Sequence, residues 1–436
     1  MKPSVASFLS DTKRLHLAFI RREGSVDETR RQALFLLGEH WQDMADSKLD
    51  SQQIGEFAVQ ATALYFQGSK LRAPRDQLLG LHPCFTEALV NDEVRSSRWA
   101  LSRVAEFAAT ISASDAAADV ANDSFEAVLR QAYTHGAAAA IADKESLHVD
   151  AKPPASFVGD IERLLFASSQ LYSPDFKFRE HHGVGAAALL SRKTKVDMQA
   201  KMQRCANASK LMGTLRNTPL TQIDALRLLT KTAKLGFFNE EVIRNCCDTI
   251  TRKLDGFQPR DIARATNALG TLGFRPAAQP IWCKHLTGKK LPADMHHALL
   301  TGLAMNQFPL DSVHAEKIIG DGLWLHGRRT SDVGWLVDML HASSVVGFRP
   351  QKFVVHSCRG LLTKIFGMSD LQLLKLLFVV GSPESWDVDP EFVDGWRKVD
   401  RVRDILVMKI AERNVAKGSS DLALIVPSAL AAAGAK

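Results

Sequence analysis

Apolar residues recur every three or four positions through most of the chain, which is the spacing of one face of an α-helix. Within residues 257–276, FQPRDIARATNALGTLGFRP, the apolar set is Ile262, Ala265, Leu269 and Leu272. Pro259 suits the first turn of this helix, because its missing N–H is not needed there. Gly273 suits the left-handed conformation that ends a helix, and Phe274 then follows as a buried anchor. The stretch therefore predicts a helix, a tight turn and the start of a second helix.

The same layout recurs along the chain. Leu-Gly-Phe at 235–237 lies 37 residues before Leu-Gly-Phe at 272–274, and GFRP at 273–276 returns at 347–350. Further copies occupy 291–309 and 330–350, and a degenerate fifth opens at Met368. Four or five copies spaced by 34–40 residues predict an α-solenoid of antiparallel helical hairpins over about 216–380. Four phenylalanines should then be equivalent and mostly buried: Phe237, Phe274, Phe308 and Phe348.

The rest of the chain is also helical in pattern, with amphipathic segments at 51–67, 96–112 and 124–142. No strand alternation persists, so the sequence predicts an all-α protein. HVDAKPPASF, at 148–157, has the adjacent prolines and polar residues of a linker. We expect the following organisation: 1–31, a targeting segment or first helix; 32–150, an N-terminal helical region; 151–215, a linker and basic helical segment; 216–380, the repeat array; 381–436, a C-terminal helical cap and Ala-rich tail.

Charge is distributed unevenly. The chain has a net charge of +7, yet residues 1–191 hold 20 Lys and Arg against 25 Asp and Glu. Residues 192–264 hold 15 against 7, so this one segment accounts for the whole basic excess. Such a local concentration of positive charge indicates an anionic partner.

The basic residues of this segment have repeat spacing. Arg227, Lys231 and Lys234 follow one another at i, i+4 and i+7, on the helix face expected to lie opposite Ile223, Leu226 and Leu229. In the next copy Arg264 is the counterpart of Arg227, because each lies nine residues before its glycine. The candidate RNA-binding residues are Arg192, Lys193, Lys195, Arg227, Lys231, Lys234, Arg260 and Arg264. Stacked repeats would align them as a strip that contacts phosphates; an ordinary solvated face and a site for an acidic protein are the alternatives.

The pattern F-x-P-x-D-I-A-x-x-x-x-A-L-x-x-L-G-F-R-P resembles the degenerate helical repeats of organellar RNA-metabolism proteins. These are the heptatricopeptide and octotricopeptide repeats and the helical regions that precede RAP domains; related arrays occur in kinetoplastid mitochondrial editing assemblies and ribosomes. The resemblance covers roughly 216–380 and implies RNA binding or scaffolding in an organelle. No RAP-like sequence follows residue 380, so it implies no nuclease activity.

The sequence and the resemblance together predict a non-catalytic RNA-binding adaptor of a mitochondrial RNA-processing or RNA-editing assembly, with RNA and other proteins of a ribonucleoprotein complex as partners. The alternative is a protein scaffold or a structural subunit of a mitochondrial ribosome. MKPSVASFLSDTKRLHLAFIRR, with its serines and basic residues around an apolar set, fits a transit peptide and a first amphipathic helix equally well. We expect a matrix location, with another organelle or the cytoplasm as alternatives, and no membrane span, because the longest apolar run is short and contains Lys375.

Enzymatic chemistry has little support in the sequence. Phosphate-binding glycine loops, nucleophile elbows, H-E-x-x-H and paired-carboxylate motifs do not occur, so we expect no catalysis, no cofactor and no metal. The six cysteines form no C-x-x-C pair and are expected to be buried as small hydrophobes: Cys84, Cys205, Cys246, Cys247, Cys283 and Cys358. Adjacent His296 and His297 are expected on the repeat surface, and Trp282 in the core.

Overall fold

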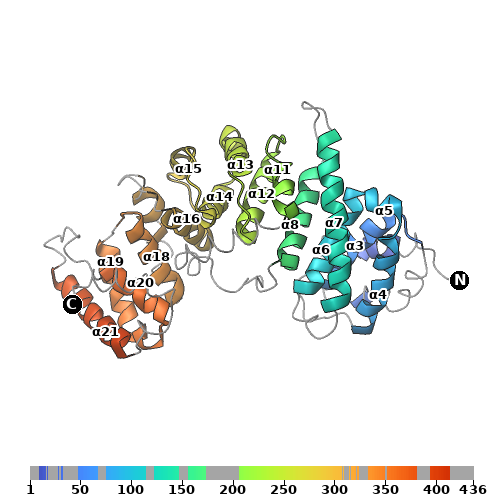
Figure 1. Cartoon of the computed structure of the whole chain (residues 1–436). Helices are drawn as coiled ribbons and strands as arrows, with labels where there is room; N and C mark the ends of the chain where they lie inside the picture. Colours follow the sequence, from blue (N-terminus) through green and yellow to red (C-terminus); the bar gives the residue numbers. More distant parts are fainter. Residues whose placement is uncertain are drawn as a thin grey trace. The chain divides into compact units, whose positions relative to one another are not determined.

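A computed structural model describes the following residues: 9–15, 48–66, 75–113, 122–146, 156–172, 206–306, 332–348, 351–380 and 393–412, with isolated positions between 17 and 32 and between 308 and 323. Every regular element in these residues is a helix (Figure 1), so the all-α prediction is confirmed for them. The chain divides into two compact units. Unit 1 holds helices α3 to α11, and unit 2 holds α12 to α21, with the first residues of α13 grouped with unit 1.

Unit 1 is built around one central helix. Its helices are α3 (Ser51–Phe66), α4 (Arg75–Ala88), α5 (Asp92–Ser96), α6 (Arg98–Ala113), α7 (Asn122–Ser146), α8 (Phe157–Tyr172) and α11 (Ala206–Gly213). The central α6 packs against α3, α7 and α8. Its apolar face meets a run of buried aromatic rings, Phe57, Phe85, Phe107 and Phe125, whose centroids lie 4.8 to 6.1 Å apart in successive pairs. The three helices expected from periodicity are therefore present as α3, α6 and α7.

Unit 2 is a succession of helices. Its elements are α12 (Gln222–Leu235), α13 (Glu240–Arg252), η1 (Leu254–Gly256), α14 (Pro259–Leu272), α15 (Gln279–Leu286), α16 (Ala293–Met305), η2 (Glu316–Gly320), α18 (Val333–Val345), α19 (Gln351–Leu361), η4 (Leu362–Gly367), α20 (Asp370–Val380) and α21 (Val393–Glu412). We call α12, α14, α16, α18 and α20 the first helices, because each opens one copy of the sequence repeat. Each first helix packs on the next, and α20 packs on α21.

Neighbouring first helices contact each other at equivalent positions. Asn267 Nδ2 in α14 donates to Thr301 Oγ1 in α16 at 3.1 Å, and Thr271 Oγ1 lies 4.0 Å from the sulfur of Met305. Both pairs are separated by 34 residues, so α14 and α16 run in the same direction and stack in register. The contact between α14 and α16 thus joins residues that are one sequence repeat apart.

The turns after α12, α14 and α18 have the geometry expected from their glycines. Gly236, Gly273 and Gly347 have φ of 72°, 68° and 85°, the left-handed region that glycine adopts without a Cβ clash. The N–H of the following residue donates five positions back, as from Phe274 to the carbonyl of Leu269 at 3.0 Å. The same bond forms at Phe237, Phe308 and Phe348, so the predicted equivalence of the four phenylalanines is confirmed. This is the Schellman arrangement of a helix end.

The burial expected for these phenylalanines is only partly correct. Phe237 is buried, with 2% of its surface exposed, but Phe274, Phe308 and Phe348 are half-buried. Phe274 contacts the ring of Phe238 from the preceding turn, with centroids 6.2 Å apart. All four residues follow the ends of first helices, so an equivalent backbone position does not by itself give equal burial.

Replacing Gly273 with valine is expected to lower the free energy of unfolding by about 1–3 kcal/mol, because a β-branched residue is strained at positive φ. Nothing lies within 4 Å of the position that a Cβ would take, so backbone strain alone should cause the loss. Gly273→Asn is the matched control and should lose less than half as much, since asparagine tolerates this conformation. Thermal unfolding of the three proteins measures the difference; equal midpoints for all three would contradict the role of φ.

Candidate nucleic-acid interface

The predicted basic residues of α12 lie on its exposed side. Arg227 and Lys234 are exposed, and Lys231 is half-buried. The helix begins at Thr221, whose Oγ1 accepts the N–H of Asp224 at 3.1 Å, and Arg227 then pairs with that aspartate at 3.2 Å. An exposed ion pair of this kind is worth about 0–1 kcal/mol, so the guanidinium can exchange it for a phosphate at little cost.

The apolar face of α12 differs from the expected one. Its buried residues are Ala225, Leu228, Leu229, Thr232, Ala233 and Leu235. Ile223, expected in the core, is 73% exposed, and Leu226 is only half-buried. At 100° per residue, Ile223 falls between Arg227 and Thr230 on the side away from Ala225. The face that carries Arg227 and Lys234 therefore also presents an apolar side chain.

The next first helix repeats this exposed face. Arg260 and Arg264 of α14 are exposed, 37 residues after Ile223 and Arg227. Since α12 packs directly on α14, and packed helices lie about 8–10 Å apart, Arg227 and Arg264 should be neighbours at that spacing. We call Arg227, Lys231, Lys234, Arg260 and Arg264 the basic face. It spans two adjacent helices of unit 2.

The basic face ends at α14. The positions of α16 and α18 equivalent to Arg260 and Arg264 are held by Asp294 and Ala298, and then by Gly334 and Asp338. At these two positions the exposed arginines of α12 and α14 are thus not continued in α16 and α18. The other predicted members, Arg192, Lys193 and Lys195, lie outside the described residues.

Later repeats place charge in the interior instead. Lys375 of α20 is 1% exposed, and its Nζ lies 2.6 Å from Oδ1 of Asp338 in α18. The other oxygen of the same carboxylate, Oδ2 of Asp338, lies 3.4 Å from Nε2 of His297 in α16. Burial raises the pKa of Asp338, but the hydrogen bond from His297 and the charge of Lys375 outweigh it, so the net pKa is lowered. Burial and Lys375 lower the pKa of neighbouring His341 to about 4. Lys375, Asp338 and His297 thus link α20, α18 and α16 through polar contacts away from solvent.

His296 and His297 do not lie on the surface as expected. His296 is 5% exposed, with Nε2 against the carbonyl of Ile318, and His297 is half-buried against Asp338. The interpretation failed because α16 is covered by neighbours on more than one side, whereas the sequence pattern of one helix shows only its most apolar face.

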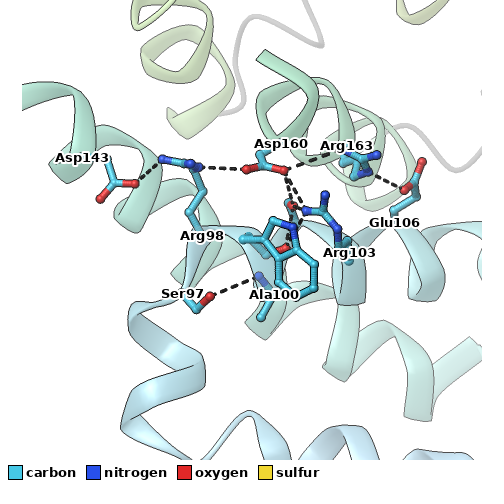
Figure 2. A network of polar contacts seen from close by, with 10 residues as sticks. Ser97, Arg98, Ala100, Arg103, Glu106, Asp143, Asp160 and Arg163 are labelled. Atoms are coloured by element: carbon cyan, nitrogen blue, oxygen red, sulfur yellow. Dashed lines mark hydrogen bonds and ion pairs between the residues drawn. The ribbon is translucent and has the colours of Figure 1, made fainter. Parts of the chain in front are cut away.

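Unit 1 contains a second charged cluster, drawn in Figure 2. Asp160, in the first turn of α8, is fully buried and accepts Arg98 Nε at 3.0 Å and Arg103 NH1 at 2.8 Å, both from α6. Arg98 also pairs with Asp143 of α7, and Arg163 Nε lies 2.8 Å from Oε2 of Glu106. Three arginines thus balance the charge of three carboxylates, and their ion pairs connect α6, α7 and α8. The ion pairs that join different helices link residues 45 to 62 positions apart in sequence, so no local motif predicts them.

Burial also lowers the reactivity of the cysteine thiols. Five of them are buried, as expected, while Cys205 lies outside the described residues. Burial raises the thiol pKa of Cys84, Cys247 and Cys358 to about 12, so these side chains stay protonated and weakly nucleophilic. Among the described residues, no group of histidine, cysteine and carboxylate side chains has the arrangement of a metal site.

Within that same part of the chain, no helix combines the length and the apolar character needed to cross a membrane. A scan against protein-family models gives no match for this sequence, and a search of curated proteins finds none that is similar to it.

Proposed function

We propose that this chain is a non-catalytic, helical-repeat RNA-binding adaptor, and that unit 2 is an α-solenoid of antiparallel helical hairpins. The order of contacts supports the solenoid, because each first helix packs on the next and α14 and α16 run in the same direction. In such an array, equivalent residues of successive repeats become neighbours on one surface. The basic face is a surface of this kind.

The observation that carries the proposal is the repetition of Arg227 by Arg264 on two packed helices, with Lys234 and Arg260 exposed beside them. Cations in a row at helix spacing suit the phosphates of a nucleic acid, and each contact releases counterions. Lysine and arginine bound to phosphate position a backbone without reading its sequence. We therefore assign the basic face to holding the RNA backbone.

The cellular setting of the proposal comes from the repeat resemblance of residues 257–276. It places the adaptor in a mitochondrial RNA-processing or RNA-editing assembly, where RNA and other subunits are its partners. A second function, protein scaffolding in such an assembly or in a mitochondrial ribosome, is favoured by one observation. Ile223, 73% exposed on the basic face, offers apolar surface of the kind that protein interfaces bury.

Changing Arg227, Lys231 and Lys234 together to alanine should weaken RNA binding to a similar extent for different RNA sequences. The slope of log affinity against log salt should shrink by about two, at roughly 0.7 per lost single-strand phosphate contact. Fluorescence anisotropy with two unrelated single-stranded RNAs over a salt series measures both quantities on the full chain.

The matched control removes the same charge from unit 1 by changing Arg14, Arg130 and Lys210, which are exposed, to alanine. The control should keep the salt slope of the unaltered chain. If both triple variants behave alike, binding is a matter of net charge and the basic face has no special role. If RNA binding is unchanged but Ile223→Asp abolishes capture of a partner subunit, the scaffold function replaces the RNA-binding one.

A further inference from the structure

The turn between α15 and α16 brings a lysine onto a histidine. His285 lies in the last turn of α15, and the chain then reverses through Gly288, whose φ is 76°. The N–H of Lys289 donates to the carbonyl of Leu286 at 3.0 Å, which fixes the turn. As a result, Nζ of Lys289 lies 2.9 Å from Nε2 of His285. Lys289 as a whole is exposed.

A carboxylate faces the other ring nitrogen. Oδ1 of Asp255, from η1, lies 4.0 Å from Nδ1 of His285. Its negative charge favours the tautomer that carries the proton on Nδ1, which leaves the Nε2 lone pair directed at Lys289. The imidazole is largely enclosed, with 12% of its side chain exposed. Burial and the charge of Lys289 lower the pKa of His285, against the opposing effect of Asp255, so the ring is neutral at neutral pH.

We propose that Lys289 is a preferred site of covalent acylation, for which acyl thioesters are the donor class and His285 is the general base. The arrangement is that of an activated nucleophile: an amine within hydrogen-bond reach of a base, and the base oriented by a third group. This modification site is independent of RNA binding by the basic face.

The ammonium group of Lys289 first loses one proton to solvent, because only the neutral amine has a lone pair. The neutral nitrogen then attacks the thioester carbonyl carbon, and Nε2 of His285 takes the second proton, which the nitrogen loses as the C–N bond forms. The C–S bond breaks, the thiolate leaves and receives the proton from the imidazolium, and the products are an ε-amide and a free thiol. No oxidant or reductant is required. The modification replaces a positive side chain with a neutral one.

Two nearby lysines serve as internal controls. Lys284 and Lys290 are exposed like Lys289, and within the described residues neither has a histidine contact. They share the reagent, the solution and the local charge of the same turn. A difference in rate between Lys289 and Lys290 therefore measures the effect of the His285 contact.

The experiment treats the full chain with S-acetyl-N-acetylcysteamine at about pH 7.5, where an ordinary histidine is mostly neutral. Initial acetylation rates at Lys284, Lys289 and Lys290 are read from peptide masses. Lys289 should react about tenfold faster than Lys290, a modest factor for a general base at an exposed site. His285→Gln should reduce the rate at Lys289 to that of Lys290 and leave the other two unchanged, which also shows that the turn is intact.

Asp255→Asn tests the positioning role of the carboxylate and should lower the rate at Lys289 by about threefold, because the productive tautomer is less favoured. Lys289 and Asp255 are the charged groups that face the imidazole in the described structure. Lowering the pH through the pKa of His285 should bring the ratio of the Lys289 and Lys290 rates toward one, because the protonated ring accepts no proton. Equal rates at the two lysines in the unaltered chain, or a ratio that survives His285→Gln, would overturn the proposal.

Discussion

Replacing Asp160 with asparagine is expected to lower the free energy of unfolding of unit 1 by about 3–5 kcal/mol, the range for removing one partner of a buried ion pair. The side chains of Arg98 and Arg103 are only 8% and 11% exposed. Water therefore cannot replace the hydrogen bonds that they lose with the carboxylate. Asparagine keeps the shape of the residue but removes the negative charge that Arg98 and Arg103 face, and that Arg163 NH1 faces at 3.6 Å. Arg98 retains Asp143, so Arg103 should account for most of the loss.

Hydrogen exchange followed by mass spectrometry measures this loss separately for each unit. Peptides from α6 and α8 should lose protection, whereas peptides from α14 and α16 should keep theirs. Glu126→Ala is the matched control, because it also deprives an arginine of its carboxylate, but at an exposed pair 2.6 Å apart on α7. Such a pair contributes about 0–1 kcal/mol. Equal effects of the two changes would show that the buried cluster does not stabilise unit 1.

The second large effect is expected at the contact of α14 with α16. Gly270 and Gly302 face each other there, and a Cβ on Gly302 would lie 2.5 Å from Cα of Asn267 and 2.6 Å from the carbonyl oxygen of Thr266. Both are backbone atoms, so no side chain can rotate away. Gly302→Ala should lower the free energy of unfolding of unit 2 by about 3 kcal/mol, at the upper end of the usual effect of overpacking.

The control for this change is Gly360→Ala in α19. Gly360 is also helical, but it is exposed and nothing lies within 4 Å of its absent Cβ. Alanine should there raise stability by about 0.5–1 kcal/mol through helix propensity alone. Urea unfolding followed by circular dichroism compares the two variants. A stabilising effect of Gly302→Ala would mean that the two helices are farther apart than the structure shows.

The sequence predicted the features of this fold that depend on neighbouring residues. The glycine turns are one example, because a left-handed residue and the bond from Phe274 to Leu269 are encoded within six positions. The cap of α12 is equally local, because Thr221 Oγ1 accepts the N–H of Asp224, three positions on. In both cases the residues that make the contact are adjacent in the chain, so the pattern itself contains the geometry.

Features that depend on distant residues could not be predicted in the same way. Ile223 was assigned to the core from its spacing, but it is exposed because the packed side of α12 centres on Ala225 and Leu229. The alanines on the packed side of α12 are only weakly hydrophobic, so they contribute little to the apolar pattern of the sequence. Their small size nevertheless allows α14 to pack close to α12. A lysine within an apolar run gives no sign of burial, and the burial of Lys375 depends on its contact with Asp338, 37 residues away. The exposure of Arg227, Arg260 and Arg264 agrees with the sequence pattern, while their binding to RNA stays a prediction.

The glycine contact between α14 and α16 also sets the distance from one repeat to the next. In the register of the repeats, the positions of Gly270 and Gly302 are occupied by Ala233 and Ala268 between α12 and α14, and by Ala304 and Ala342 between α16 and α18; all six are buried. A facing pair without methyl groups lets two backbones approach more closely than a pair of alanines does, so we expect the spacing of α14 and α16 to be the smallest of the three. Exchanging glycine and alanine at these pairs would lengthen or shorten single steps, and with them the separation between rows of surface side chains, while the surface sequence stays the same.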